Sequence, residues 1–154
     1  ASDVVPCEQR PWMKCAEITD ELIACLRSGK YKYLRVNFPN GDMVGHTGSF
    51  LATECSMEAL DLQLARILKV VDELQGVALI TADHGNADEM LEKNKKGDVA
   101  VRTAHSLNEV PFIIYSKNAY EVKDGAFGLA NVAPTVAKVF GIEPYASWEE
   151  SIIK

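Results

Sequence analysis

The sequence predicts an α/β fold in which a mixed, mostly parallel sheet lies between layers of helices. Segments with helical periodicity alternate along the chain with short apolar runs, and this alternation is typical of sheets covered by helices. The chain has 154 residues, of which 47% are hydrophobic, and this is enough for a compact fold with a core. We therefore expect residues 1–154 to belong to a single domain.

Two segments in the first half of the chain have helical periodicity. Residues 14–26 place apolar side chains on one face, and Gly29 follows as a stop signal. Residues 53–74 hold a 3.6-residue apolar period over their whole length, and Gly76 follows them. Both segments are predicted to be helices.

Three short apolar runs predict strands. Residues 33–38 form the first, and the Pro-Asn-Gly cluster at 39–41 is expected to close it as a turn. Residues 77–80 are wholly apolar, which suits the middle of a sheet covered on both faces. Residues 110–116 form the third run. Together these runs predict a sheet assembled from distant parts of the chain.

The remaining segments are shorter and more polar. Residues 86–93 predict a short helix capped by Asn86. Residues 94–101 predict a polar hairpin or loop. Residues 131–140 predict a final helix that ends at Gly141.

Composition excludes several classes of function. The net charge of −6 and the lack of a basic run argue against nucleic-acid partners, and no apolar run is long enough to span a membrane. The four cysteines have no C-x-x-C spacing; they are Cys7, Cys15, Cys25 and Cys55. We expect reduced thiols in a cytoplasmic protein, although an even count also allows two disulfides.

All three histidines lie in short polar segments next to apolar runs. Asp42 and His46 follow the first predicted strand, and Asp83 and His84 follow the second. Because ligands bind beyond the carboxyl ends of strands in such sheets, both pairs should lie at one edge. His105 precedes its strand, so it reaches that edge only if the strand over 110–116 runs antiparallel to the other two.

These residue types are those of a divalent-metal site. Asp42 and His46 are spaced i, i+4, so one helical turn brings them together. With His105 they offer two imidazoles and one carboxylate, and three protein ligands leave a position open. Mixed nitrogen and oxygen ligands favour manganese, zinc, cobalt or iron over magnesium and calcium.

Asp83 and His84 are too few for a complete site. If they hold a second metal, its other ligands must come from elsewhere, and no obvious carboxylate partner is present in the sequence. The alternative is an ordinary turn in which the aspartate caps the next segment.

Three stretches of the chain resemble the cofactor-independent phosphoglycerate mutases of the alkaline phosphatase superfamily. They are N-F-P-N-G-D-M-V-G-H-T-G at 37–48, I-T-A-D-H-G-N-A at 80–87 and T-A-H-S at 103–106. The similarity continues in order along nearly the whole chain, including residues 11–20 and 130–141. It covers only the carboxyl-terminal part of the family's phosphatase-like domain, because family members are much longer.

The resemblance implies a metal-dependent isomerase of glycolysis. Such enzymes interconvert 3-phosphoglycerate and 2-phosphoglycerate through a phosphoserine, usually with two manganese ions, for which magnesium, cobalt or zinc are alternatives. By position, the resemblance assigns Asp42, His46 and His105 to one metal, Asp83 and His84 to the other, and Arg10 to a phosphate contact.

The resemblance also implies that this chain is inactive alone. The nucleophilic serine, an aspartate on the second metal and the inserted substrate-binding domain have no counterpart here. Thr47 and Ser49 are near the first motif but are typical turn residues. The expected partners are phosphoglycerate and the missing amino-terminal portion. Alternatives are another phosphatase or phosphomutase of the superfamily, or a non-catalytic metal-binding module.

Overall fold

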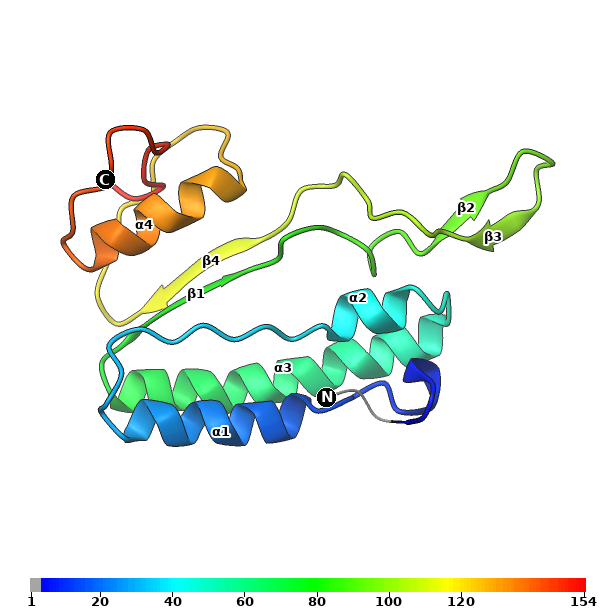
Figure 1. Cartoon of the computed structure of the whole chain (residues 1–154), viewed down its shortest axis with the longest axis horizontal. Helices are drawn as coiled ribbons and strands as arrows, with labels where there is room; N and C mark the ends of the chain where they lie inside the picture. Colours follow the sequence, from blue (N-terminus) through cyan, green and yellow to red (C-terminus); the bar gives the residue numbers. More distant parts are fainter. Residues whose placement is uncertain (1–3) are drawn as a thin grey trace. The chain divides into compact units, whose positions relative to one another are not determined.

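A computed structural model describes residues 4–154. The chain divides into two compact units, Ala1–Ser116 and Lys117–Lys154, the first of which is described from residue 4 (Figure 1). The elements are η1 Cys7–Gln9, α1 Cys15–Arg27, α2 Asn40–Gly45, α3 Phe50–Glu73, β1 Val77–Thr81, β2 Leu91–Lys93, β3 Val99–Val101, β4 Phe112–Ser116, η2 Leu129–Asn131 and α4 Val132–Val139. Within the described part, no helix combines the length and apolar character needed to cross a bilayer.

The two long helices α1 and α3 lie side by side in the first unit (Figure 1). Both were predicted, and both are confirmed to within a few residues. Helix α3 begins three residues before its predicted start at residue 53. The Ser49 hydroxyl caps it there and accepts a hydrogen bond from the amide of Ala52 at 3.4 Å. At its end, Gln75 takes the left-handed conformation, with φ 53°, and the Gly76 amide donates to the Val71 carbonyl at 2.9 Å.

Helix α2 stands where a turn was expected at residues 39–41. That prediction is wrong, because Pro39 is the N-cap and Asn40 is the first helical residue. The Asn40 side chain is buried and donates to the carbonyls of Pro11 and Trp12, at 3.3 and 3.2 Å. These bonds, together with the fully buried Val44, fix α2 on the first unit.

The strand predicted over residues 33–38 is not formed. This segment is extended and mostly exposed, and it pairs with no strand among residues 4–154. A strand needs a neighbour to satisfy its backbone donors and acceptors, and the apolar pattern alone does not supply one. Tyr33 is accordingly 55% exposed and Val36 38% exposed.

Strands β1 and β4 pair antiparallel, with Val77 opposite Ser116 and Thr81 opposite Phe112. The expected direction of the third strand relative to β1 is therefore confirmed. Strand β1 pairs only with β4 among the described residues, and it is only half-buried. It was expected in the middle of a sheet covered on both faces, and the described residues do not place it there. No parallel strand pair forms among residues 4–154, because the segment 33–38 makes no hydrogen-bonded pairing with another strand.

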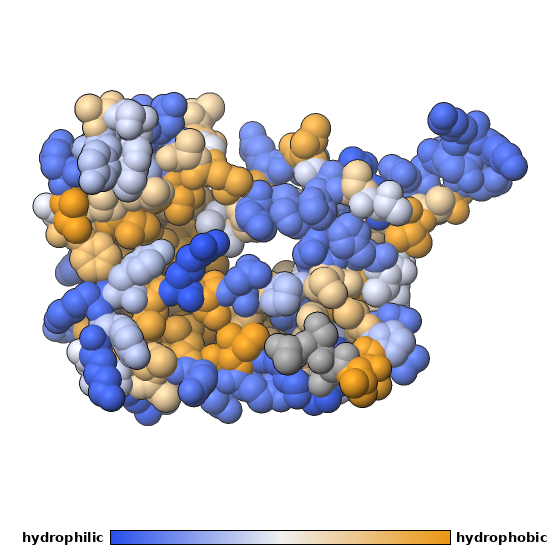
Figure 2. Space-filling model, viewed as in Figure 1, coloured by the Kyte–Doolittle hydropathy of each residue, from blue (hydrophilic) through white to orange (hydrophobic). Residues whose placement is uncertain are grey.

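Residues 86–93 were predicted to be a helix, and this is wrong. Turns occupy most of the segment before β2, which pairs with β3 as an antiparallel hairpin. The Asn94 side-chain oxygen accepts from the amides of Lys96 and Asp98, at 2.8 and 3.0 Å, and so closes the hairpin turn. Figure 2 shows that the hairpin tip is hydrophilic.

The second unit is built on η2 and α4, which confirm the predicted final helix. Thr135 is fully buried; its hydroxyl donates to the Asn131 carbonyl at 2.6 Å and accepts from the Ile152 amide at 2.9 Å. Gly141, with φ +67°, follows the helix as expected. All four cysteines are free thiols, as predicted, and burial raises the pKa of the Cys15 thiol.

Candidate metal centre

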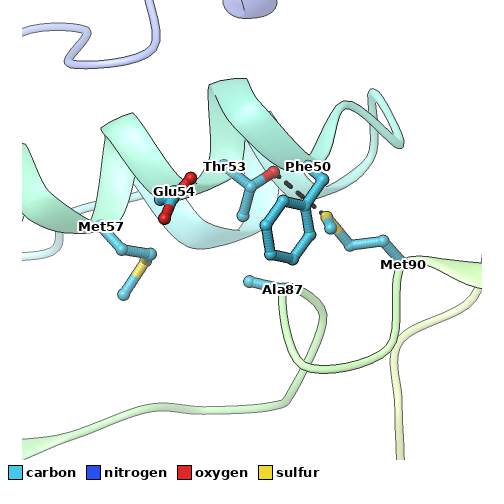
Figure 3. A pocket seen from close by; sticks show the side chains of 6 residues that line it. All are labelled: Phe50, Thr53, Glu54, Met57, Ala87 and Met90. Atoms are coloured by element: carbon cyan, nitrogen blue, oxygen red, sulfur yellow. Dashed lines mark hydrogen bonds between the residues drawn. The ribbon is translucent and has the colours of Figure 1, made fainter.

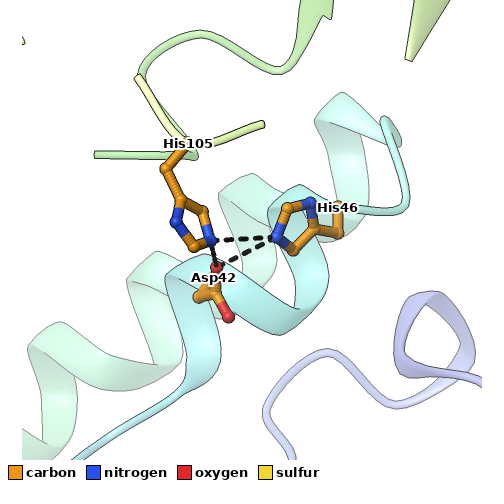
Figure 4. Close-up of side chains that lie close together, drawn as sticks. All are labelled: Asp42, His46 and His105. Atoms are coloured by element: carbon orange, nitrogen blue, oxygen red, sulfur yellow. Dashed lines mark hydrogen bonds and ion pairs between the residues drawn. The ribbon is translucent and has the colours of Figure 1, made fainter. Parts of the chain in front are cut away.

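Three predicted ligands converge at one point in the first unit. His46 Nε2 and His105 Nε2 each lie 3.2 Å from Asp42 Oδ1, and the two nitrogens lie 3.4 Å from each other (Figure 4). Their side chains are partly exposed, at 34% for Asp42, 33% for His46 and 47% for His105. The site is therefore an accessible rim and not a closed cavity.

The spacing of these three atoms fits a divalent metal. Ligands at roughly 2.0–2.2 Å from a tetrahedral ion lie about 3.3–3.6 Å apart, and those at right angles about 2.8–3.1 Å apart. The observed separation of 3.4 Å falls in the tetrahedral range, and the two of 3.2 Å fall between the two ranges. Among the described residues this is the one group of three or more His, Cys, Asp or Glu side chains with such geometry. The residues present therefore fit the metal that the sequence implies.

The positions of the ligands follow from local structure. Asp42 lies in α2 and His46 is its C-cap residue one turn later, so their side chains lie on the same side of the helix (Figure 4). His105 comes from the loop between β3 and β4. Its neighbour Ser106 donates its amide to the Gly85 carbonyl at 3.0 Å, so this loop is tied to the turn after β1.

A carboxylate outside the ligand group holds the two loops together. Asp88 Oδ2 accepts from the Ser106 hydroxyl at 2.7 Å and from the Asn108 amide at 2.6 Å. These two bonds hold the pKa of the Asp88 carboxyl below its ordinary value. A side chain at Gly85 would lie 2.1 Å from the Ser106 oxygen, so the close approach of the loops requires glycine there.

The sequence reasoning missed one residue at this centre. Asn86, only 7% exposed, places Nδ2 3.3 Å from Asp42 Oδ1 and 3.0 Å from His46 Nε2. We expected it to cap a helix, and that helix does not exist. Its position two residues after His84 was the available signal, because the turn that carries Asp83 and His84 was expected at this edge.

The predicted second site is only partly assembled. His84 stacks on His105 with ring centroids 3.6 Å apart, so it lies beside the first site. Asp83 is 79% exposed, and its Oδ1 lies 3.6 Å from His84 Nε2. No third donor joins this pair among residues 4–154.

The other three candidates lie at helix ends and in a turn. Arg10 ends the short helix η1 and is half-buried. The Thr47 hydroxyl donates to the Val44 carbonyl at 2.6 Å, and the Ser49 hydroxyl caps α3. Both hydroxyls thus have turn and capping partners. That neither is a nucleophile stays a prediction.

A neighbouring groove does not have the character of a polar site. It measures about 230 Å³ and is lined by Phe50, Thr53, Glu54, Met57, Ala87 and Met90 (Figure 3). The Thr53 hydroxyl already contacts the Ser49 carbonyl at 3.0 Å and the Met90 sulfur at 3.1 Å. Glu54 is then the only carboxylate of a mostly apolar lining, and none of the predicted ligands belongs to it.

Comparison with known families agrees with a metal centre. The metalloenzyme superfamily matches residues 1–144, which is nearly the whole chain. The chain belongs to the metalloenzyme superfamily. Its match spans every residue of the convergent group described above, from Asp42 to His105.

Within the metalloenzyme superfamily, the chain is similar to phosphoglycerate mutases. The 2,3-bisphosphoglycerate-independent phosphoglycerate mutase of Trypanosoma brucei brucei is 42% identical over 99% of this chain and 30% of its own length. The enzyme of the same name from Vibrio parahaemolyticus is 42% identical over 87% of this chain and 26% of its own length. The chain thus spans about 30% of the first relative, in its carboxyl-terminal part.

A solved structure shows the same fold. The Leishmania mexicana phosphoglycerate mutase, crystallised at low cobalt concentration, matches with a TM-score of 0.91 and 40% identity, over 99% of this chain and 30% of that chain. This match confirms the predicted α/β, alkaline-phosphatase-like fold class. It also confirms the family resemblance that the three motifs indicated.

Proposed function

We propose that this chain is the carboxyl-terminal portion of the phosphatase-like domain of a cofactor-independent phosphoglycerate mutase. The complete enzyme would interconvert 3-phosphoglycerate and 2-phosphoglycerate as an isomerase of glycolysis. The observation that carries the proposal is the convergence of Asp42 Oδ1, His46 Nε2 and His105 Nε2 within 3.4 Å of one another. It occurs in a chain that is 42% identical to a named mutase over nearly its whole length.

The first metal site in this proposal consists of Asp42, His46 and His105. Two imidazoles and one carboxylate suit manganese, with cobalt, zinc or magnesium as alternatives. A cation held here would neutralise charge on a phosphoryl group that reaches the rim. The partial exposure of all three side chains supports this role, because a substrate must have access to the open position.

We assign Asp83 and His84 to a second metal, completed by residues outside this chain. The stacking of His84 on His105 supports that placement, because it sets the two sites next to each other. Arg10 would contact the substrate phosphate as a guanidinium fork. The nucleophilic serine and most substrate contacts would come from the amino-terminal portion of the same enzyme, so the chain alone should not turn over phosphoglycerate.

We also propose that the enzyme is cytoplasmic, as its place in glycolysis requires. The four free thiols support a reducing compartment. Neither a nucleic acid nor a membrane is part of the proposal; phosphoglycerate is the small-molecule partner.

The test is an activity assay on the complete protein that contains this chain. Phosphorus NMR would follow 3-phosphoglycerate with manganese present and after chelation, beside a sugar phosphate and an aryl phosphate. We expect metal-dependent formation of 2-phosphoglycerate and no turnover by residues 1–154 alone. Hydrolysis of the aryl phosphate without mutase activity would favour another phosphatase of the superfamily. Metal binding without activity on any of these three phosphates would favour the non-catalytic metal-binding module.

A further inference from the structure

A buried amide faces two of the three proposed metal ligands. Asn86 is 7% exposed, and its Nδ2 lies 3.3 Å from Asp42 Oδ1 and 3.0 Å from His46 Nε2. These are the same two atoms that converge with His105. No other buried side-chain amide among the described residues is hydrogen-bonded to this group, since the Asn40 amide bonds to Pro11 and Trp12 and that of Asn131 to Glu150.

The two contacts of this amide differ in what a bound metal would leave of them. A carboxylate oxygen has more than one lone pair, so Asp42 Oδ1 can accept from the Asn86 amide and hold a metal at the same time. A ring nitrogen has a single lone pair, so a metal on His46 Nε2 would take the place of the amide there. The contact that lasts when a metal binds is therefore the one to Asp42, and it orients that carboxylate.

The backbone of α2 leaves room for this amide at one position. A Cβ built on Gly45 would lie 2.2 Å from Asn86 Oδ1 and 3.1 Å from Asn86 Cγ. The first of these distances does not occur between real atoms and the second is tight, so the side chain at 86 packs directly on the helix backbone. Gly45 and Asn86 together join α2 to the turn that carries Asp83 and His84.

We propose that Asn86 is a positioning residue of the metal centre, acting through Asp42, and that Gly45 is required for its placement. This inference rests on the proposed metal site. Hydrogen-bonded partners of metal ligands typically contribute a factor of about 10–100 in metal affinity. We expect loss of the Asn86 amide to weaken cobalt or manganese binding by a factor in this range.

The experiment is a calorimetric titration of Co²⁺ into the full chain at neutral pH, together with the visible absorption spectrum of the bound ion. The variants are Asn86→Ala and the near-isosteric Asn86→Leu, which keeps side-chain volume but removes the amide. The matched control is Asn131→Ala, which removes another buried asparagine, 8% exposed and bonded to Glu150, from the unit that lacks the metal ligands. Gly45→Ala keeps the amide but displaces it from α2.

We expect Asn86→Ala, Asn86→Leu and Gly45→Ala each to weaken Co²⁺ binding by about 10-fold or more and to change the spectrum. Asn131→Ala should lose stability while its affinity and spectrum match the wild type. If the wild type binds Co²⁺ and a folded Asn86 variant binds it within twofold and with the same spectrum, this inference is overturned and the metal site stands. If the wild type does not bind Co²⁺, the metal site proposed for this chain is wrong, and the inference that rests on it is wrong as well.

Discussion

The two histidine motifs of the chain differ in how completely the fold assembles a site around them. On α2, Asp42 and His46 meet His105, and three ligand atoms come within 3.4 Å of one another. In the turn after β1, Asp83 stays 79% exposed, and its partner His84 stacks on a histidine of the first group. Among residues 4–154, one motif forms a complete three-ligand set and the other does not.

The difference follows from backbone geometry. One helical turn places residues i and i+4 on the same face, so α2 brings its aspartate and histidine together without outside help. Adjacent residues after a strand diverge, and they converge on an ion only if other segments supply further donors. A short helix thus brings two ligands together by its own geometry, whereas the adjacent Asp83 and His84 need donors from other segments.

The largest expected effect comes from removing one histidine from each motif. His46→Ala should weaken manganese binding by more than about 100-fold, because it deletes a ligand and not merely a partner of a ligand. His84→Ala should leave the affinity of the first site within a few-fold of the wild type, because His84 lies beside that site without belonging to it. Calorimetric titration of the two variants measures the contrast directly. Equal losses in both would show that the motifs form one site.

A smaller effect is expected from crowding the contact between the two loops. In Gly85→Ala the new methyl group would meet Ser106 Oγ at 2.1 Å and Asp88 Oδ1 at 2.6 Å, so their hydrogen bond must break or shift. We expect a loss of about 1–3 kcal/mol in the free energy of unfolding, together with weaker metal binding, because the loop that carries His105 moves.

Gly128→Ala is the matched control for that substitution. A Cβ there meets nothing within 4 Å, and the backbone at φ −135° suits any residue. Its free energy of unfolding should stay within about 0.5 kcal/mol of the wild type. Urea unfolding followed by circular dichroism measures both variants. A Gly85→Ala protein as stable as Gly128→Ala would mean that the loops are not in close contact.

The smallest effect concerns Asp88, whose pKa the hydrogen bonds from Ser106 and Asn108 lower below its ordinary value of 3.8. Because the folded pKa is lower than the unfolded one, the stabilisation is fully present above the ordinary value and is lost as pH falls through the folded pKa. Asp88→Asn removes this contribution. We expect it to lower stability near pH 6 by under about 1 kcal/mol, because the carboxylate is exposed to solvent.

The acid limb of the stability curve provides the check on Asp88. Urea unfolding at about pH 6 and about pH 3 should show that the gap between the wild type and Asp88→Asn narrows in acid. Ser106→Ala removes one donor and should reproduce part of the effect. A gap that is constant over this range would contradict the link between the two loops.

The sequence was sufficient where structure depends on local periodicity. Helices α1, α3 and α4 were predicted because apolar residues repeat along their own lengths. The strand over 33–38 failed because strands depend on a partner, which the described residues do not provide. The turn expected at 39–41 became α2 because Asn40 bonds to residues 28 and 29 positions away, a contact that no local pattern reveals.

The candidate site, too, was predicted only in part from the sequence. The types and spacing of Asp42, His46 and His105 were enough to predict that they would group, given one antiparallel strand. The part of Asn86 was missed, because asparagine at the start of a polar stretch is typical of a helix cap. Its contacts arise because α2 packs against a turn that is distant in the sequence. Asn86 and His46 are 40 residues apart along the chain.

The most direct test is a crystal structure of the chain with Mn²⁺ or Co²⁺, in which anomalous scattering locates the ion. We expect one ion roughly 2.0–2.2 Å from Asp42 Oδ1, His46 Nε2 and His105 Nε2. An ion bound elsewhere, or a fully loaded crystal with no ion among these three atoms, would contradict the assignment of this rim as a metal centre.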